Sequence, residues 1–259
     1  MTRSKALIVV YGEWESIKNM LLDIDVLLPG HDVYMLGVIP CLRGRAMLNK
    51  LYVDVVMRKL DKEFSEAEKI LREKNIDVAG KEVVRGKPGE ALREHVVRKG
   101  YETVFIPLQL PPSKRLLVAV AKPVLEGRTS LILYTPQTRI GSSKDILILA
   151  KDKPPYRFHT GYTSLVDIDT IELAFTHKPS TEKIEEYLAR RKDLRYKHLV
   201  ITRLQSREVE EKIEEGLKEY RFVIIHPDIF YKKVFRGYML TPLARAIILS
   251  TQRPVIVSA

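Results

Sequence analysis

The chain has 259 residues, of which 45% are hydrophobic and 30% are charged. This composition excludes a disordered chain, and the length is sufficient for two domains that each bury a core. The formal net charge is +11, with 23 Lys and Arg against 17 Asp and Glu in residues 1–143 and 21 against 16 in residues 144–259. Nucleic-acid-binding proteins usually concentrate positive charge in a tail or on one face, so this even spread argues against a nucleic-acid partner without excluding one.

Cysteine content and the length of apolar runs indicate the compartment. The single Cys41 cannot form an internal disulfide, which is typical of a reducing cytosol. No apolar run approaches the ~20 residues of a membrane span, and the N-terminus lacks the apolar segment of a secretory signal. We therefore expect a cytoplasmic protein with no membrane partner. Asn (three) and Gln (four) are rare beside Lys, Arg and Glu. This pattern is typical of a thermophile and predicts a melting midpoint above the ~45–65 °C of mesophile domains.

Strand and helix patterns alternate regularly through the first half. Short apolar runs predict strands, and apolar residues at intervals of three or four predict helices. In chain order these are a strand at 6–10, a helix at 16–28, a strand at 33–39, a helix at 47–74, a strand at 76–84, a helix at 88–99, a strand at 103–107, a helix at 114–125 and a strand at 129–134. Strands separated by helices favour right-handed crossovers and a parallel sheet with helices on both faces.

The second half repeats this plan with losses. A polar, turn-rich stretch predicts a linker at 137–144, between a domain at 1–136 and a second domain at 145–259. The predicted elements are strands at 145–150, 171–176, 199–202, 222–225 and 254–257 and helices at 181–191, 208–220 and 242–249. Residues 151–170, where the first half has its first helix, form an aromatic, proline-rich segment for which we predict no helix. Its aromatic rings either stack a base or fill the space of the missing helix, and we favour the second interpretation.

Three patterns in the first half carry a family resemblance. They are the strand at 7–10 followed by Gly12, the sequence Val-Arg-Gly-Lys-Pro-Gly-Glu-Ala at 84–91, and the helix–strand pair at 116–134. On these patterns the chain resembles the universal stress protein family in its tandem form, with a degenerate second copy. The resemblance implies an α/β fold of two doubly wound, five-stranded parallel sheets of order 3-2-1-4-5, as in adenine-nucleotide alpha-hydrolase-like proteins. Ligands of such sheets bind beyond the carboxyl ends of strands one and four.

The chain departs from the pattern of the family members that bind ATP. Those members place an acidic residue after strand one, a glycine-rich loop after strand four, and Gly with Ser or Thr at the last helix. Here Tyr11 replaces the acid, and the loop at 108–113 has no glycine and two prolines, which lack the N–H donors that bind phosphate. Val118 and Ala119 stand at the helix position. The second copy keeps only Asp152 and Gly237.

We therefore predict that ATP is not held in the family manner and that no cofactor is needed, with ATP or AMP kept as the less favoured option. Basic residues near the first cleft offer another site, because converging loops would let them receive an anion; solvated caps are the interpretation that we favour. The candidate ligand-binding residues are Tyr11, Gly12, Arg43, Arg45, Lys114, Arg115, Asp152 and Gly237. No His pair has metal-ligand spacing and no nucleophile has its base, so we predict neither a metal site nor an enzyme.

The leading functional hypothesis is a non-catalytic, stress-associated binding or interaction protein. The resemblance implies that the two halves associate as an internal pseudo-dimer, with residues 131–133 and 255–257 as the paired edges. We expect two sheets rather than one continuous sheet, and the resemblance also allows a homodimer. The alternatives are a nucleotide- or anion-binding regulator and a nucleic-acid-associated basic protein.

Overall fold

The computed structural model describes residues 4–12, 14–27, 30–41, 46–108, 114–155, 168–190, 196–205, 208–209, 211, 218–235, 237–250 and 252–259. The strands of the first half are β1 (Lys5–Val10), β2 (Asp32–Pro40), β3 (Val78–Gly86), β4 (Thr103–Pro107) and β5 (Ser130–Tyr134). Its helices are α1 (Trp14–Leu22), α2 (Ile24–Leu27), α3 (Ala46–Glu73), α4 (Pro88–Lys99), α5 (Lys114–Ala119) and α6 (Ala121–Leu125).

The second half contributes five further strands to the main sheet. They are β6 (Ile146–Ala150), β7 (Ile168–Phe175), β8 (Tyr196–Arg203), β9 (Phe222–Ile225) and β12 (Val255–Val257). Its helices are α7 (Thr181–Arg190), α9 (Pro227–Phe230) and α10 (Pro242–Ser250), and β10 (Tyr231–Val234) pairs with β11 (Gly237–Leu240) in a separate hairpin. The predicted helix at 208–220 and the aromatic residues Tyr156, Phe158 and Tyr162 lie largely or wholly outside the described residues.

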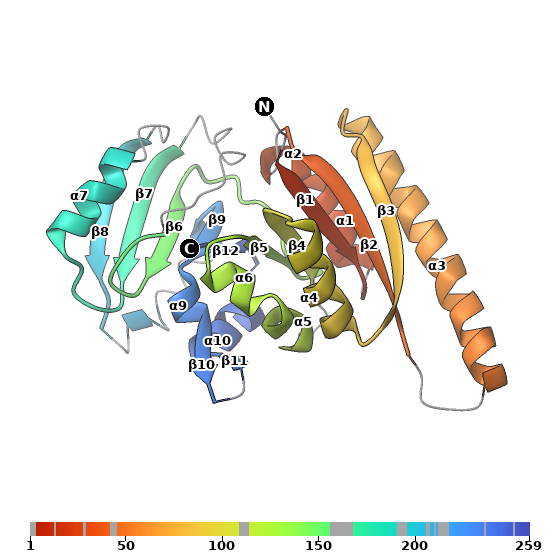
Figure 1. Ribbon diagram of the computed structural model, residues 1–259. Helices are drawn as coiled ribbons and strands as arrows, with labels where there is room; N and C mark the ends of the chain where they lie inside the picture. The colour runs from red at the N-terminus through yellow and green to blue at the C-terminus, as the bar shows by residue number, and fades with distance from the viewer. Residues whose placement is uncertain are drawn as a thin grey trace.

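Ten strands form one sheet, in the order β3-β2-β1-β4-β5-β12-β9-β6-β7-β8 (Figure 1). Each half has the predicted order 3-2-1-4-5, and neighbours within a half are parallel. The predicted pairing of the fifth strands is confirmed, because Leu131, Ile132 and Leu133 pair antiparallel with Val257, Ile256 and Val255. The expectation of two separate sheets is corrected by the same pairing. Each fifth strand would otherwise leave a row of unpaired backbone groups at an edge, and hydrogen bonding between the edges joins the sheets.

The sheet separates two apolar cores, each of which extends across both halves. Alternate side chains of a strand point to opposite faces, so Leu7 and Val9 enter one core whereas Ile8 and Val10 enter the other. Helices α4, α5, α6, α9 and α10 cover the first face, and α1, α2, α3 and α7 cover the second. Figure 1 looks onto the first face, with α4, α5, α6 and α9 in front of the sheet.

Two predicted helices are interrupted. The predicted helix at 16–28 is divided into α1 and α2 at Asp23, whose carboxylate accepts hydrogen bonds from the Tyr134 hydroxyl (3.0 Å) and the Ile140 N–H (3.1 Å). The predicted helix at 114–125 is divided into α5 and α6 at Val120. Pro123 explains this break, because it lacks an N–H and its ring crowds the carbonyl four residues earlier. No helix among the described residues is long and apolar enough to cross a membrane.

Candidate functional site

The topology places one crevice in each half. Strand order reverses between β1 and β4 in the first half and between β6 and β9 in the second. In open parallel sheets, ligands bind beyond the carboxyl ends of the strands at this reversal. The candidate sites therefore lie where residues 11–12 and 108 follow β1 and β4, and where residues 151–153 and 226–228 follow β6 and β9.

The described part of the first crevice is lined by Tyr11, Gly12 and Leu108. Tyr11 is half-buried, and burial raises the pKa of its phenol, with a smaller contribution from Tyr52 of α3. Gly12 has a φ of 116°, which other residues rarely adopt. Leu108 is buried; its N–H donates to the Tyr134 carbonyl (2.6 Å), and its own carbonyl accepts from the Ser16 hydroxyl (3.2 Å). Both backbone groups of Leu108 therefore already have protein partners.

The four predicted cations divide into two pairs. Arg43 and Arg45 lie outside the described residues. Lys114 and Arg115 are exposed at the start of α5, and no hydrogen bond or ion pair within the described part of the chain links them to Tyr11. The position of α5 depends on Gly89 of α4, because a Cβ atom there would lie only 2.9 Å from the Arg115 carbonyl oxygen. The close approach of α4 thus positions the start of α5, and with it Lys114 and Arg115.

The second crevice holds a buried histidine that the sequence did not single out as a site residue. His226 follows β9 and is 5% exposed. Its backbone N–H donates to the Leu149 carbonyl (2.9 Å), and its ring Nδ1 accepts from the backbone N–H of Asp228 (3.3 Å). Burial lowers the pKa of the imidazole, and this effect exceeds the opposing effect of the Asp228 and Asp152 carboxylates. The strand-ending sequence Ile-His-Pro was the available signal.

Asp152, the predicted acidic residue, forms an ion pair in this crevice. Its carboxylate lies 3.6 Å from Nζ of Lys183 in α7, and both side chains are partly exposed. His226 is close enough to Asp228, Lys153 and Asp152 to interact with each of them electrostatically. No group of three or more metal-binding side chains is found among the described residues, and Cys41 is exposed. The crevice thus offers polar contacts to a ligand without the arrangement of a metal centre.

The segment after β9 occupies the position of the phosphate-binding loop in the resembled family. It folds into α9 and the β10–β11 hairpin, which places Gly237 at the hairpin with a φ of 140°. Phe230 and Tyr231 are buried with their rings edge to face at 5.0 Å. The Tyr231 hydroxyl donates to the Leu117 carbonyl of α5 (3.0 Å), and complete burial raises the pKa of this phenol. The segment therefore holds the two halves together.

The geometry of the whole chain has counterparts among solved structures. The crystal structure of a universal stress protein from Archaeoglobus fulgidus superimposes with a TM-score of 0.61, covering 98% of this chain and 97% of that one at 13% sequence identity. The chain has the universal stress protein fold. A protein of unknown function and a universal stress protein, both from Pseudomonas aeruginosa, give TM-scores of 0.48 and 0.47 at 13% and 14% identity; each alignment covers 99% of this chain and 92% of the other. The sequence matches no protein-family model and no curated protein.

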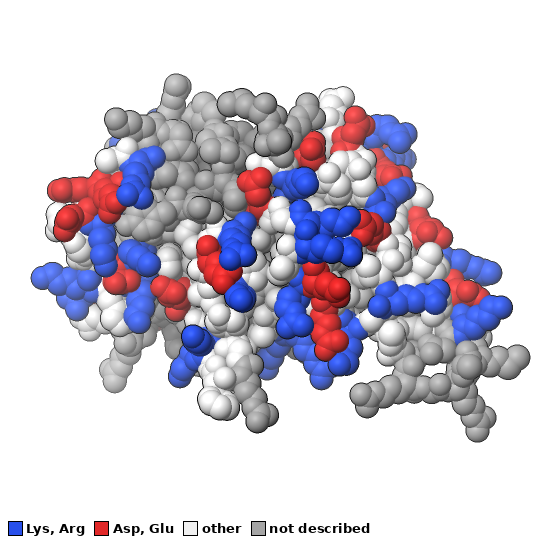
Figure 2. Space-filling view, viewed as in Figure 1, with Lys and Arg blue, Asp and Glu red and all other residues white. Residues whose placement is uncertain are grey.

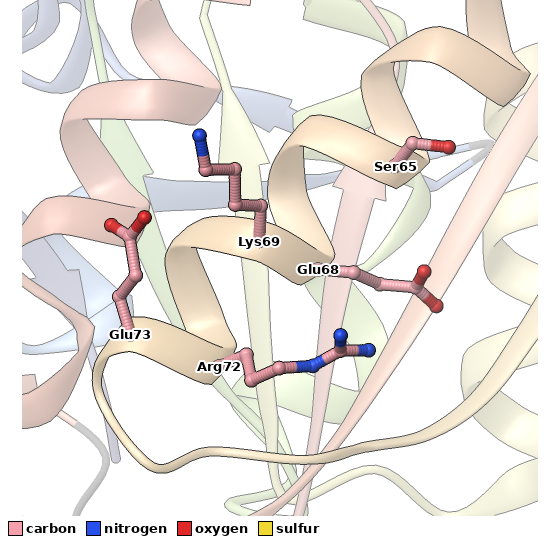
Figure 3. A pocket seen from close by; sticks show the side chains of 5 residues that line it. All are labelled: Ser65, Glu68, Lys69, Arg72 and Glu73. Carbon is pink, nitrogen blue, oxygen red and sulfur yellow. The ribbon is translucent and has the colours of Figure 1, made fainter.

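Within the universal stress protein fold, two surface hollows lie away from both crevices. One of about 360 Å³ is lined by Ser65, Glu68, Lys69, Arg72 and Glu73, all from α3, with side chains that diverge from the helix (Figure 3). The other, of about 380 Å³, lies between α4 and α6. Two of its cations, Lys122 and Arg128, already pair with Glu126 at 3.9 and 3.2 Å. We interpret both hollows as solvated helix surfaces.

Proposed function

We propose that this protein is a non-catalytic, stress-associated binding protein that does not hold ATP in the manner of the family it resembles. One observation carries the proposal. In the second half, N–H groups at both ends of the segment expected to face phosphate, those of Ile229 and Thr241, are hydrogen-bonded to acceptors within the protein.

Hydrogen bonds along the segment after β9 support the proposal that this segment does not bind phosphate. The N–H groups of Ile229 and Thr241 donate to the carbonyls of His226 and Phe230 at 3.0 and 3.1 Å. Residues 231–234 and 237–240 pair in the hairpin. A phosphate binds at such a turn through unused N–H groups. A phosphate could use the N–H groups of Ile229 and Thr241 only by breaking these hydrogen bonds.

The N-terminus of α10 is also capped from within the chain. The Thr241 hydroxyl accepts from the Ala244 N–H (3.0 Å) and donates to the Ile229 carbonyl (2.6 Å), while Pro242 has no N–H at all. A serine or threonine cap of this kind satisfies one of the N–H donors that make a helix N-terminus attractive to anions. Together with Pro242, which has no N–H, it leaves fewer free donors at the start of the last helix.

Calorimetric titration with ATP, ADP and AMP tests the proposal. We expect no saturable heat in the micromolar range for any of the three nucleotides. Micromolar binding that is preserved in a Lys114→Ala/Arg115→Ala double variant would contradict the proposal, because it would place the nucleotide in a crevice. The variant Thr241→Ala is the matched test, since it uncaps α10 and would strengthen binding if the cap alone excludes phosphate.

The second candidate function is an anion- or nucleotide-binding regulator, and the exposure of Lys114 and Arg115 favours it. Within the described chain neither side chain has an ion-pair partner. Micromolar binding that the double alanine variant abolishes would favour this candidate over the first. Binding of nucleic acid by the same cations would instead weaken steeply as salt rises.

A further inference from the structure

The β10–β11 hairpin lies outside the ten-stranded sheet and projects from the body of the molecule (Figure 1). Its two strands have four residues each, paired antiparallel from Tyr231–Leu240 to Val234–Gly237. Among the described residues, the hairpin pairs with no strand of that sheet. The side chains that it presents therefore need their own explanation.

Three apolar side chains in the described part of this hairpin are open to solvent. Phe235 is 99% exposed, Met239 is 40% exposed and Val234 is 36% exposed. We refer to these three residues as the hairpin tip. Phenylalanine is usually buried on folding, and a contiguous exposed apolar group is typical of an interaction surface.

The base of the hairpin prevents the tip from folding back onto the protein. Phe230, Tyr231 and Leu240 are buried, and the Tyr231 hydroxyl is hydrogen-bonded to Leu117. Strand β11 also lies against α5. Because one end of the hairpin is held in the core, the ring of Phe235 is kept in solvent.

Positive charge surrounds the tip. Lys232 and Lys233 are exposed on β10, and Lys114 and Arg115 are exposed on α5, the helix that contacts β11. Residues 229–259 contain five Lys and Arg and no Asp or Glu. Figure 2 shows uncharged side chains on the described part of the hairpin, at the lower edge of the molecule, with basic side chains to either side of its base. The hairpin thus presents exposed apolar side chains next to exposed cations on β10 and α5.

We propose that the hairpin tip inserts into the interface of an anionic phospholipid membrane, with Lys232, Lys233, Lys114 and Arg115 against the lipid headgroups. Apolar side chains flanked by Lys and Arg are the combination by which proteins bind reversibly to anionic bilayers. This contact is peripheral, so it needs no membrane-spanning helix. It differs from the expectation, drawn from the lengths of the apolar runs, that the protein has no membrane partner.

Two other partners fit the tip less well. Single-stranded nucleic acid stacks successive bases on aromatic faces, whereas the tip offers one aromatic ring, that of Phe235, beside the aliphatic Val234 and Met239. A protein partner would have to supply a pocket shaped to a convex tip, whereas the acyl-chain boundary of a bilayer accepts any apolar side chain. The cations select the anionic lipid over the zwitterionic one.

Vesicle sedimentation of the full chain tests this proposal. We expect binding to phosphatidylcholine vesicles that contain about 30% phosphatidylserine, little binding to phosphatidylcholine alone, and weakening as salt rises and screens the cations. Phe235→Trp supplies a reporter, and its emission is expected to shift to the blue on binding, against the background of Trp14. Equal binding to both vesicles, or none to either, would overturn the proposal, as would preferential binding to an oligonucleotide of matched charge.

Two variants and a control separate insertion of the hairpin tip from nonspecific adsorption to vesicles. Phe235→Ser is expected to weaken vesicle binding by about tenfold or more, because it removes the aromatic ring that the bilayer would bury in the bound state. Lys232→Glu with Lys233→Glu is expected to abolish the preference for phosphatidylserine. Leu51→Ser removes an apolar side chain that is 64% exposed on α3, away from the hairpin, and should leave binding unchanged. Equal loss in Phe235→Ser and Leu51→Ser would refute a specific tip.

This inference rests on the proposed role as a binding protein, since it names a partner for that role. The two fail separately, however. Nucleotide binding detected by calorimetry would refute the proposed function and leave vesicle binding intact. An absence of vesicle binding would refute the inference, and the calorimetric titration would still show no nucleotide binding.

Discussion

At the residue scale, a buried histidine connects α4 to the edge of the first half. Nε2 of His95 lies 3.2 Å from the Tyr101 hydroxyl, and Nδ1 lies 3.5 Å from the Glu82 carboxylate of β3. His95 is 3% exposed, and burial lowers the pKa of its imidazole more than the Glu82 carboxylate raises it. Burial lowers the pKa of His226 in the same way. Both histidines are therefore neutral in the folded protein over a range where an unfolded histidine gains a proton.

These two histidines make stability depend on pH. Below the ordinary histidine pKa of 6.5, the unfolded chain binds protons that the folded chain does not, so the free energy of unfolding should fall as pH decreases from about 7.5 to 5.5. Each histidine contributes a slope of at most about 1.4 kcal/mol per pH unit. Chemical denaturation at several pH values measures this dependence.

The variant His95→Gln is expected to show a shallower pH dependence, because one of the two groups is gone. A pH profile of His95→Gln parallel to that of the unaltered protein would show that His95 does not contribute.

At the element scale, the segment between β9 and α10 links the two halves on the first face of the sheet. Helix α9 packs against α6, and β11 packs against α5. The patterns that predict strands and helices did not reveal this segment, because a helix of four residues and strands of four residues are too short for a period to appear. The segment is built from contacts with elements more than 100 residues earlier in the chain.

Among the described residues of this segment, the Tyr231 hydroxyl makes a hydrogen bond to the first half that can be removed with little change in the shape of the side chain. Tyr231→Phe leaves the buried Leu117 carbonyl without this donor, so we expect a loss of about 1–3 kcal/mol in the free energy of unfolding. Urea denaturation measures the loss. Tyr238→Phe is the matched control in the same hairpin, because the Tyr238 hydroxyl has no hydrogen bond within the described chain, and a loss as large in that variant would count against the role of the Tyr231 bond.

At the scale of the whole molecule, the fifth strands join the two halves into one sheet. Ile132 and Ile256 face each other across this junction, and both are fully buried. The outer strands of the sheet are then β3 and β8, whose side chains are mostly half-buried or exposed. The strands through which two separate copies would associate are already paired inside one chain.

We therefore propose that the protein is a monomer in solution and not the homodimer that the resemblance also allows. Light scattering over a range of concentrations should give the mass of one chain throughout. A dimer at micromolar concentration would contradict this, and cross-linking would then show whether β3 or β8 forms the contact.

The sequence by itself determined the fold class, and the family resemblance that its patterns carry implied the strand order of each half and the strands that join them. Buried parallel strands read as unbroken apolar runs, and helices between them favour right-handed crossovers, so local patterns suffice for the fold class. Strand order and the pairing of the fifth strands came from the resemblance. The sequence also located residues such as Tyr11 and Lys114 at the ends of strands or helices. It could not show whether they converge, and the candidate residues at 43 and 45 lie outside the described chain.

Only the tertiary structure decided how the halves merge and what occupies the second crevice. Edge strands pair or stay apart according to the backbone groups that meet in space, and two separate sheets and one continuous sheet share the same local pattern. Burial of His226, the capping of α10 by Thr241 and the exposure of Phe235 depend on neighbours distant in sequence. A phenylalanine in a sequence is expected in a core, and the surrounding fold alone shows that this one lies in solvent.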